Sequence, residues 1–536
     1  MKKFFTLFIL AIVLNALAFA QPAPNVRNKT TEKFSTALFY LQSAYVDTVN
    51  QEALTEHAIR GMLKKLDPHT VYMTPKEMKD ANEPLQGNFE GIGVMFNVIE
   101  DTITVISAVS GGPSEKVGIQ PGDKIVKVDT TNMTGKNTTD GFVMKMLRGP
   151  KGSSVKVLVL RRGDKKLLEF TIIRDKIPIL SVDATYMIDS ETGYLKINRF
   201  GASTMKEFRD GLRDLKGKGM KNLILDLQGN SGGYLQTAID LCDEFLGKDK
   251  MIVYTEGVHS PRQESNSKIG GMFENGKLIV LIDEGSASAS EIVGGCVQDH
   301  DRALIVGRRS FGKGLVQNTY LLPDGSAMRI TTARYFTPSG RCIQRSYKDG
   351  VDAYYKDLKS RYKNGELTHP DSIHVANDSL KYFTDGKRLV FGGGGIMPDF
   401  FVPLDTSYTT PYLQKLYSKT SIRDFANAYV DKNRADLKLR YPTVDEFKRN
   451  FRVDDVMLDG LASAADKNGV PRNDAEMKTS APAIKTQMKA IVANQLFNTT
   501  AYYQVINDLN PIYKKALELI KDDTFDKMKI AYTTGQ

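Results

Sequence analysis

Hydrophobic residues near the start of the chain recur at the spacing of a helix. One set, at i, i+4, i+7 and i+11, consists of Phe34, Leu38, Leu41 and Tyr45. A second apolar run covers residues 54–66 and stops at an Asp-Pro pair, which does not continue a helix. We therefore expect an N-terminal helical region over residues 21–85.

Residues 86–175 show a different pattern, in which short apolar runs alternate with glycine-containing turns. Such spacing is typical of short strands joined by tight turns. We expect a small β-rich domain there.

From residue 176 to 405, apolar runs long enough for buried strands alternate with amphipathic helical segments. The expected strands cover residues 193–200, 222–227, 278–282 and 303–306, and a helix is expected over residues 205–215. Strands that alternate with helices predict an α/β core. Within it, the polar, charged residues 346–389 are expected to form an insertion, partly loop.

The last part of the chain, residues 406–536, also carries apolar residues at helical spacing. They include Ile484, Met488, Ile491, Val492 and Leu496. We expect a helical C-terminal domain, whose role as a cap, an oligomerisation arm or a substrate tether stays open. The whole chain is thus predicted to be multidomain α+β, as its length of 536 residues also implies.

Composition narrows the function classes. The charged fraction of 25% and the hydrophobic fraction of 41% are those of a globular protein, and the formal net charge of +10 is spread over the chain. Without a basic stripe that carries interleaved aromatic residues, nucleic acid is not an expected partner. The three cysteines and six histidines show no metal-ligand spacing, so we expect no metal, no cofactor and no disulfide framework.

Residues 1–20 have the three parts of a signal peptide. Lys2 and Lys3 are basic, residues 4–17 are apolar, and Ala18-Phe19-Ala20 fits a cleavage site. An uncleaved N-terminal anchor is the alternative. We expect cleavage near Gln21 and an exported protein, periplasmic or secreted, that is soluble afterwards.

The stretch from Lys277 to Gln317 carries the candidate chemistry. An apolar strand leads into a turn with three alternate serines, and helical spacing resumes after it. A sharp turn before a helix N-terminus exposes a hydroxyl and places free N–H groups beside developing negative charge. No histidine lies in an obvious triad arrangement, so Lys313 is the candidate base, provided that burial keeps it neutral. Taken alone, each of these serines could equally be a helix cap.

Three strings in this region together resemble the C-terminal processing peptidases, also called tail-specific proteases. They are 285–291 (GSASASE), 298–303 (QDHDRA) and 307–317 (GRRSFGKGLVQ). The resemblance implies that Ser288 is the nucleophile, that Lys313 is the base and that Gln317 orients the lysine. It also implies a crotonase-like α/β serine peptidase core.

The same resemblance suggests an oxyanion hole. The run 226–233 (DLQGNSGG) is similar to a family motif, from which Gln228 and Ser231 depart. By this likeness the backbone amides of Gly232 or Gly233, together with that of Ala289, would stabilise the oxyanion. The Ser231 departure leaves the choice of glycine open, and an ordinary strand-to-helix turn is the alternative interpretation.

Residues 112–129 resemble a PDZ domain, which the family carries as an inserted domain. PDZ domains bind free C-termini by adding a strand to a sheet edge, with exposed N–H groups holding the carboxylate. The candidate loop consists of Gly91, Ile92, Gly93 and Val94. Its glycines could instead make a bulge. By resemblance, Arg148 is a further candidate that would couple this domain to the peptidase core.

The combined prediction is an exported serine endopeptidase that recognises C-terminal tails of protein or peptide substrates and cleaves them through an acyl-enzyme. A catalytically silent PDZ scaffold or adaptor and an exported Ser-Lys amidase or esterase are the alternatives. His69 and His300 would become the candidate bases if Lys313 proved dispensable. The sequence leaves open a regulatory adaptor and homo-oligomerisation.

Overall fold

The structure is a computed structural model that describes residues 28–99, 101–109, 111–136, 138–161, 163–268, 270–372 and 380–532. The predicted signal peptide lies outside these residues. No helix within the described ranges combines the length and apolarity needed to span a bilayer. The chain divides into two compact units, Met1–Leu66 and Asp67–Gln536, which are described separately.

The first unit contains two helices, α2 (Lys29–Ala44) and α3 (Gln51–Leu63). Each starts at an asparagine N-cap, Asn28 or Asn50, whose side chain accepts a hydrogen bond from a backbone N–H in the first turn. The N-terminal helical region is therefore confirmed.

A six-stranded sheet forms the centre of the second unit, in the order β10-β11-β12-β15-β16-β21. Its strands are β10 (Val182–Met187), β11 (Thr192–Ile197), β12 (Asn222–Asp226), β15 (Leu278–Ile282), β16 (Leu304–Gly307) and β21 (Phe400–Phe401). All neighbours except β10 and β11 pair in parallel. The α/β prediction and four of its strands are confirmed.

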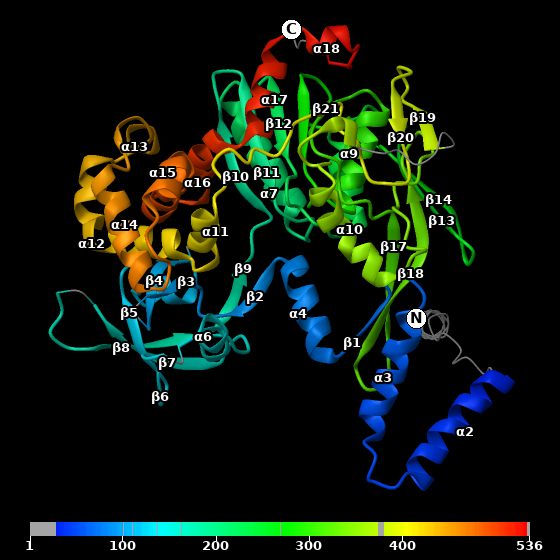
Figure 1. The fold of residues 1–536 in the computed structure, drawn as a ribbon, viewed down its shortest axis with the longest axis horizontal. Helices are drawn as coiled ribbons and strands as arrows, with labels where there is room; N and C mark the ends of the chain where they lie inside the picture. The colour runs from blue at the N-terminus through cyan, green and yellow to red at the C-terminus, as the bar shows by residue number, and fades with distance from the viewer. Residues whose placement is uncertain are drawn as a thin grey trace, which may run out of the picture. The chain divides into compact units, whose positions relative to one another are not determined.

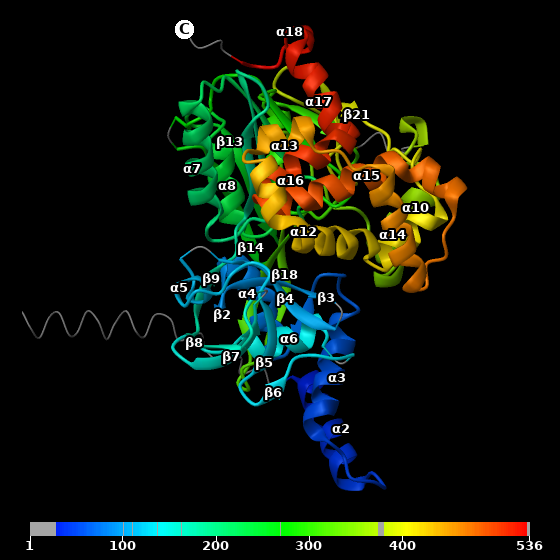
Figure 2. The same ribbon diagram turned by 90° about the vertical axis from the view of Figure 1, so that its left-hand side faces the viewer.

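Helices cover both faces of this sheet (Figures 1 and 2). One face packs against α7 (Thr204–Gly217), α8 (Leu235–Asp243) and α9 (Ala289–Asp299). The other face packs against α17 (Pro511–Lys521) and α18 (Thr524–Lys527), which come from the far end of the chain. The strands are buried on both faces, which explains their nearly continuous apolar runs.

A second sheet stands beside the first, in the order β1-β18-β13-β14 with β17 on β18. Its strands are β1 (Val71–Met73), β13 (Met251–Gly257), β14 (Ser260–Asn266), β17 (Leu315–Leu321) and β18 (Ala327–Phe336). Strand β1 was not predicted, because its short apolar sequence gains its partner, β18, only in the folded chain. Helix α4 (Pro75–Gln86) follows it, with a Thr74–Glu77 capping box.

The small β-rich domain has a sheet in the order β3-β4-β5-β7-β8, with β6 on β5. The elements are β3 (Val94–Ile99), β4 (Thr102–Ala108), α5 (Pro113–Lys116), β5 (Lys124–Val128), β6 (Thr131–Asn132), α6 (Asp140–Leu147), β7 (Ser154–Leu160) and β8 (Leu168–Ile173). It is entered and left through a two-stranded ribbon of β2 (Asn88–Gly91) and β9 (Asp175–Pro178).

The residues after the second sheet form α10 (Val351–Lys363), the 3-10 turn η1 (Pro370–Ser372) and a hairpin of β19 (Lys381–Phe383) and β20 (Leu389–Phe391). The helical C-terminal domain is confirmed. It has its own apolar core and consists of α11 (Pro411–Ser418), α12 (Ser421–Arg440), α13 (Val444–Asn450), α14 (Asp455–Lys467), α15 (Asp474–Leu496) and α16 (Thr499–Ile506). A 3-10 turn, η3 (Asn507–Leu509), leads from it into α17.

Candidate active site

Ser288 lies where β15 turns into α9. It occupies the N-cap position of the helix with φ 54° and ψ −111°, a conformation that non-glycine residues rarely adopt. A sharp turn of this kind presents a side chain away from the flanking strand and helix. The backbone alone therefore singles out Ser288 among the serines of the turn.

The neighbouring serines have structural roles. The Ser286 hydroxyl donates to the carbonyl of Leu227 at 2.8 Å, and the Ser290 hydroxyl donates to the carbonyl of Asn230 at 2.8 Å. Both are fully buried. These bonds fasten the Ser288 turn to the loop that follows β12.

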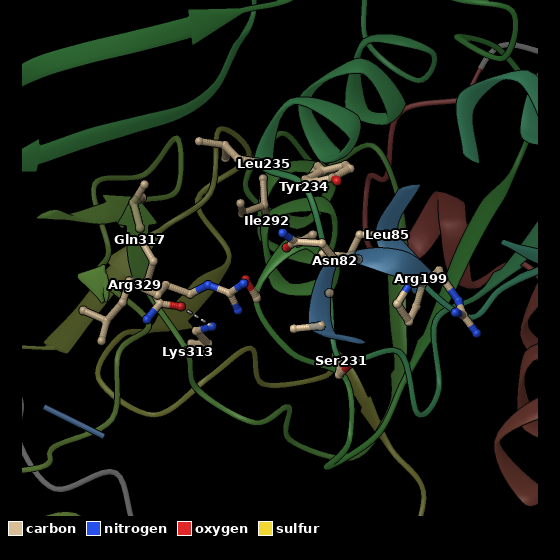
Figure 3. A pocket seen from close by; sticks show the side chains of 18 of the residues that line it. Asn82, Leu85, Arg199, Ser231, Tyr234, Leu235, Ile292, Lys313, Gln317 and Arg329 are labelled. Carbon is tan, nitrogen blue, oxygen red and sulfur yellow. Dashed lines mark hydrogen bonds between the residues drawn. The ribbon is translucent and has the colours of Figure 1, made fainter. Parts of the chain in front are cut away.

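Lys313 and Gln317 line the same pocket as Ser288. The Lys313 ammonium donates to Gln317 Oε1 at 3.0 Å, as Figure 3 shows. Burial lowers the pKa of Lys313, and the Arg329 guanidinium lowers it further, whereas the carboxylates of Glu291 and Asp67 oppose the shift. Within the described residues no hydrogen bond joins Lys313 to Ser288, and the side chain that holds the lysine ammonium in their shared pocket is Gln317.

Glu291 connects the serine turn with the lysine loop. Its carboxylate accepts hydrogen bonds from the N–H groups of Ser288, Gly312 and Lys313, at 2.8, 2.6 and 2.9 Å, and from the Ser310 hydroxyl at 2.5 Å. Burial raises the pKa of Glu291, and these donors oppose the rise. Sequence reasoning missed this role, although the spacing Ser-x-x-Glu at a helix start signals a glutamate that folds back on the N-cap.

The two glycines of the loop after β12 lie against the Ser288 turn. A Cβ on Gly232, whose φ is +102°, would be 2.8 Å from Ser288 Cβ and 3.0 Å from Ala289 N. Only glycine permits this close approach. The Gly232 N–H donates to Asn230 Oδ1 at 2.9 Å, whereas the N–H groups of Gly233 and Ala289 have no acceptor among the described residues.

The histidines have other partners. The His300 ring contacts Asp385 and the Met251 carbonyl, and it does not line the pocket that holds Ser288 and Lys313. The His69 ring lies 2.9 Å from the Tyr354 hydroxyl, and burial, followed by the charge of Lys313, lowers the pKa of His69 to about 4. The backbone carbonyl of His69, not its ring, takes part in the site, because it accepts a hydrogen bond from the Gln317 amide.

The pocket has a volume of about 560 Å³. Its walls come from Lys313 and β17, from β18, from the segment after β11, from the glycine loop, and from α9 and α4. Figure 3 places Lys313, Gln317 and Arg329 on one side and Leu85, Arg199 and Ser231 on the other. The contribution of α4 was not predicted, because nothing in its sequence indicates that it packs beside the glycine loop.

The predicted peptide-binding residues lie apart from this pocket, in the small β-rich domain. Gly91 ends β2, Ile92 is buried, and Val94 begins β3. Gly93 has a φ of +72°, and a Cβ there would be 2.8 Å from an Ile177 methyl group. The loop packs with α6 in a common apolar core.

Arg148 lies at the end of α6 and reaches α4. Its guanidinium pairs with Glu83 at 2.5 Å and lies 4.6 Å from the centre of the Phe89 ring. Because other residues of α4 line the catalytic pocket, Arg148 is one contact away from the wall of the candidate active site.

The described residues contain no group of three or more His, Cys, Asp or Glu side chains that could hold a metal ion. The three cysteines are free thiols. Cys242 and Cys296 are buried in the core beside the central sheet.

Four family models match the chain. They are peptidase family S41 over residues 191–355, a PDZ domain over 91–172, the N-terminal domain of the activating protease CtpB over 15–77, and a family of unknown function (DUF8443) over 412–498.

Curated relatives match across most of the chain. A carboxy-terminal-processing protease from Bartonella bacilliformis is 33% identical over 70% of this chain and 85% of its own length. The carboxy-terminal processing protease CtpB from Bacillus subtilis is 33% identical over 67% of this chain and 75% of its own. The solved structure of a photosystem II D1 C-terminal processing protease is 29% identical over 58% of this chain and 83% of its own, with a TM-score of 0.35.

Proposed function

Since the chain belongs to the carboxy-terminal processing proteases of peptidase family S41, which are serine-type peptidases, we propose that Ser288 is its nucleophile and Lys313 its general base. The observation that carries this assignment is their meeting in one pocket, with Ser288 on a strained turn and Lys313 buried enough to lower its pKa. A neutral lysine can accept a proton, whereas a charged one cannot.

The proposed reaction begins when Ser288 Oγ attacks the peptide carbonyl carbon and its proton passes to the neutral Lys313 amine. The N–H groups of Ala289 and Gly233 stabilise the oxyanion, since neither has another acceptor in the described part of the chain, while the Gly232 N–H is held by Asn230. Lys313 then protonates the leaving nitrogen as the C–N bond breaks. Water then attacks the carbonyl carbon of the resulting ester and gives a proton to Lys313. As the bond between the acyl carbon and Ser288 Oγ breaks, Lys313 returns a proton to Ser288 Oγ.

Gln317 is proposed to orient the base. Its Oε1 accepts from Lys313, and its amide nitrogen donates to the His69 carbonyl, so both ends of the side chain are fixed. A fixed acceptor holds the lysine Nζ in one place and prepares it for the serine.

The PDZ domain is proposed to capture exposed, apolar C-terminal tails through the loop of Gly91, Ile92, Gly93 and Val94. A tail that adds to the edge of β3 would form main-chain hydrogen bonds, and its carboxylate would meet the N–H groups of the loop. Residues 1–20 are proposed to direct export. N-terminal sequencing of the protein recovered outside the cytoplasm tests this step, with a new N-terminus near Gln21 as the expected result.

Digestion of an unfolded reporter protein tests the assignment of the dyad. We expect the wild type to cleave a reporter with an apolar C-terminus, and to cleave a charged-tail version more slowly. Ser288→Ala and Lys313→Ala are expected to lose cleavage. Lys206→Ala, which removes an exposed lysine of α7, is the control and should cleave as the wild type does.

Two results would contradict the proposal. If Lys313→Ala cleaved as fast as the wild type, another base would have to serve Ser288. If the wild type bound the tail but cleaved nothing, the chain would act as a binding protein under these conditions.

A further inference from the structure

The described lining of the catalytic pocket contains three cationic side chains and no acidic one. The cations are Lys313, Arg199 and Arg329. The proposed mechanism uses Lys313 in its neutral form. The two arginines have no part in the proton transfer.

The buried arginines elsewhere in the peptidase core are held by the chain itself. Six pair with carboxylates, namely Arg308, Arg309, Arg341, Arg345, Arg361 and Arg388. A seventh, Arg302, donates to the backbone carbonyls of Phe245 and Phe273. Among the residues that the structure describes, neither Arg199 nor Arg329 has a carboxylate partner. The Arg199 guanidinium donates to Asn198 Oδ1 at 2.8 Å, whereas the Arg329 guanidinium has no hydrogen-bond acceptor among the described residues. A guanidinium that is partly withdrawn from water without an anion is unfavourable, so Arg329 indicates that an anion comes from outside the chain.

Arg329 is the better placed of the two. It lies on β18 directly opposite Thr319 of β17, and both residues line the pocket together with Gln317, two positions before Thr319. Figure 3 shows its guanidinium group reaching toward the middle of the pocket, next to Lys313. Arg199 lies on the opposite side.

We propose that Arg329 binds a carboxylate of the substrate close to the scissile bond, so that this peptidase prefers an acidic residue near its cleavage site. Arg199 adds positive potential from the opposite wall. The inference rests on the proposed function of the same pocket, since it assumes that peptide passes between Ser288 and Lys313. It assigns a specificity element inside the catalytic pocket, separate from tail capture by the PDZ domain.

The chemistry of peptides limits the anion to two sources. Unmodified chains carry carboxylates on Asp and Glu side chains and at the C-terminus. A guanidinium fork matches either one with two parallel N–H···O bonds. An internal acidic side chain is the source we expect, because a C-terminal carboxylate could reach Arg329 only if the bond cleaved lay within a few residues of the chain end.

Quenched fluorescent peptides with an amidated C-terminus test the proposal. A single Glu is moved through the positions on both sides of the cleaved bond, and each peptide is compared with its Gln counterpart. For the wild type we expect kcat/KM to favour Glu over Gln by about 10-fold at one or two adjacent positions. Arg329→Gln should remove this preference for Glu. Arg329→Glu should reverse it and favour Lys at the same position.

Arg334→Gln is the matched control. Arg334 lies on the same strand, is exposed and does not line the catalytic pocket, so the ratio should stay at its wild-type value. A second arm compares short peptides that end in a free acid with their amides. A large preference for the free acid, with none for internal Glu, would overturn the assignment of an acidic side chain and place the chain end there instead.

The inference and the proposed function fail in different ways. If uncharged peptides are cleaved by the wild type and not by Ser288→Ala, the dyad stands. If the ratio of kcat/KM for the Glu peptide to that for the Gln peptide is then the same in the wild type and in Arg329→Gln, only the proposed role of Arg329 is overturned. Since each ratio is measured within one variant, a general loss of activity or stability does not imitate the result.

Discussion

At the scale of single residues, the chemistry depends on how the surroundings of Lys313 favour its neutral form. Burial is the main cause and the Arg329 charge the second. In the proposed mechanism the active form is the neutral amine, so kcat/KM should rise with pH through the lowered pKa of Lys313 and fall below it. His69 does not account for a rising limb of this pH profile near neutrality, because the pKa of His69 is about 4.

Arg329→Gln should move this limb to higher pH, since the substitution removes a repulsive charge from beside the ammonium. The measurement is the pH dependence of kcat/KM for an uncharged peptide, which keeps substrate binding by Arg329 out of the comparison. Arg334→Gln serves again as the control. A limb that stays in place, or moves to lower pH, would contradict the assignment of the limb to Lys313.

Strain at Ser288 gives a second prediction. A non-glycine residue at φ 54° and ψ −111° costs about 1–3 kcal/mol, and glycine avoids most of this cost while losing about 0.5–1 kcal/mol in backbone entropy. Ser288→Gly and Ser288→Ala should both be inactive. The glycine variant should be more stable, by about 1 kcal/mol in the free energy of unfolding.

Denaturant unfolding of the two variants, followed side by side, checks this difference. Ser286→Gly and Ser286→Ala form the control pair, because Ser286 does not have a positive φ and both variants lose its buried hydroxyl bonds. Equal stabilities for the two Ser288 variants would mean that the turn relaxes once the serine is gone.

At the scale of elements, the sequence predicted what is local. The run 278–282 followed by small residues and then by Ile292, Val293 and Cys296 at helical spacing identifies β15, the turn and α9 without reference to the rest of the chain. The local pattern alone did not choose among the three serines of this turn, each of which could be a helix cap; the choice of Ser288 came from the family resemblance.

Features that depend on distant partners could not be predicted. The strand β1 is three residues long and is defined by its pairing with β18. The choice between the two glycines depends on where the Asn230 side chain points, and the position of Arg329 in the pocket depends on its register with β17. A sequence pattern indicates the hydrophobic period of a helix or strand and which of its faces is buried, but not which other element packs against that face.

Helix α17 makes such a contact with a segment distant in sequence, and this contact leads to a third prediction. Its N-cap, Asn510, accepts from the N–H groups of Ile512 and Tyr513, and its amide donates to Gln228 Oε1 at 2.9 Å. Gln228 begins the loop that carries Gly232 and Gly233, so the C-terminal segment braces the predicted oxyanion loop.

Asn510→Ser keeps a good helix cap but is too short to reach Gln228. We expect stability within about 0.5 kcal/mol of the wild type and a several-fold lower kcat, well below the roughly 100-fold cost of removing an oxyanion donor. Asn510→Ala should lose about 1 kcal/mol of stability in addition. Asn473→Ser, which changes the N-cap of α15, is the control and should leave kcat unchanged. An unaltered kcat in Asn510→Ser would show that the contact does not brace the loop.

At the scale of the whole second unit, the PDZ domain is joined to the peptidase core and also touches the helical C-terminal domain. The ribbon of β2 and β9 forms the covalent connection. The turn at residues 121–123, before β5, lies against α12, where a Cβ on Gly122 would be 3.3 Å from Asp431. The pair of Arg148 and Glu83 is the contact that leads to the catalytic pocket, through α4. A tail that binds beside α6 would act first on the helix that ends at Arg148.

We therefore expect an apolar tail peptide, added separately, to change the rate at which the wild type cleaves a reporter without such a tail. A ligand can shift a conformational equilibrium only through contacts that differ between the two states, and the ion pair to α4 is the contact able to carry that difference. In Arg148→Ala the tail peptide should still bind, because the loop of Gly91 to Val94 is intact, but the change in rate should disappear.

The decisive comparison is between binding and stimulation in the same variant. Fluorescence anisotropy measures tail binding, and reporter cleavage with and without saturating peptide measures coupling. Lys156→Ala removes an exposed ion pair on the PDZ sheet and should keep both properties. If Arg148→Ala kept the full response to the peptide, the signal would have to pass through the β2–β9 ribbon or through α12. If it lost binding as well, Arg148 would belong to the tail site itself, because its Cα lies only 3.6 Å from the position of a Cβ on Gly91.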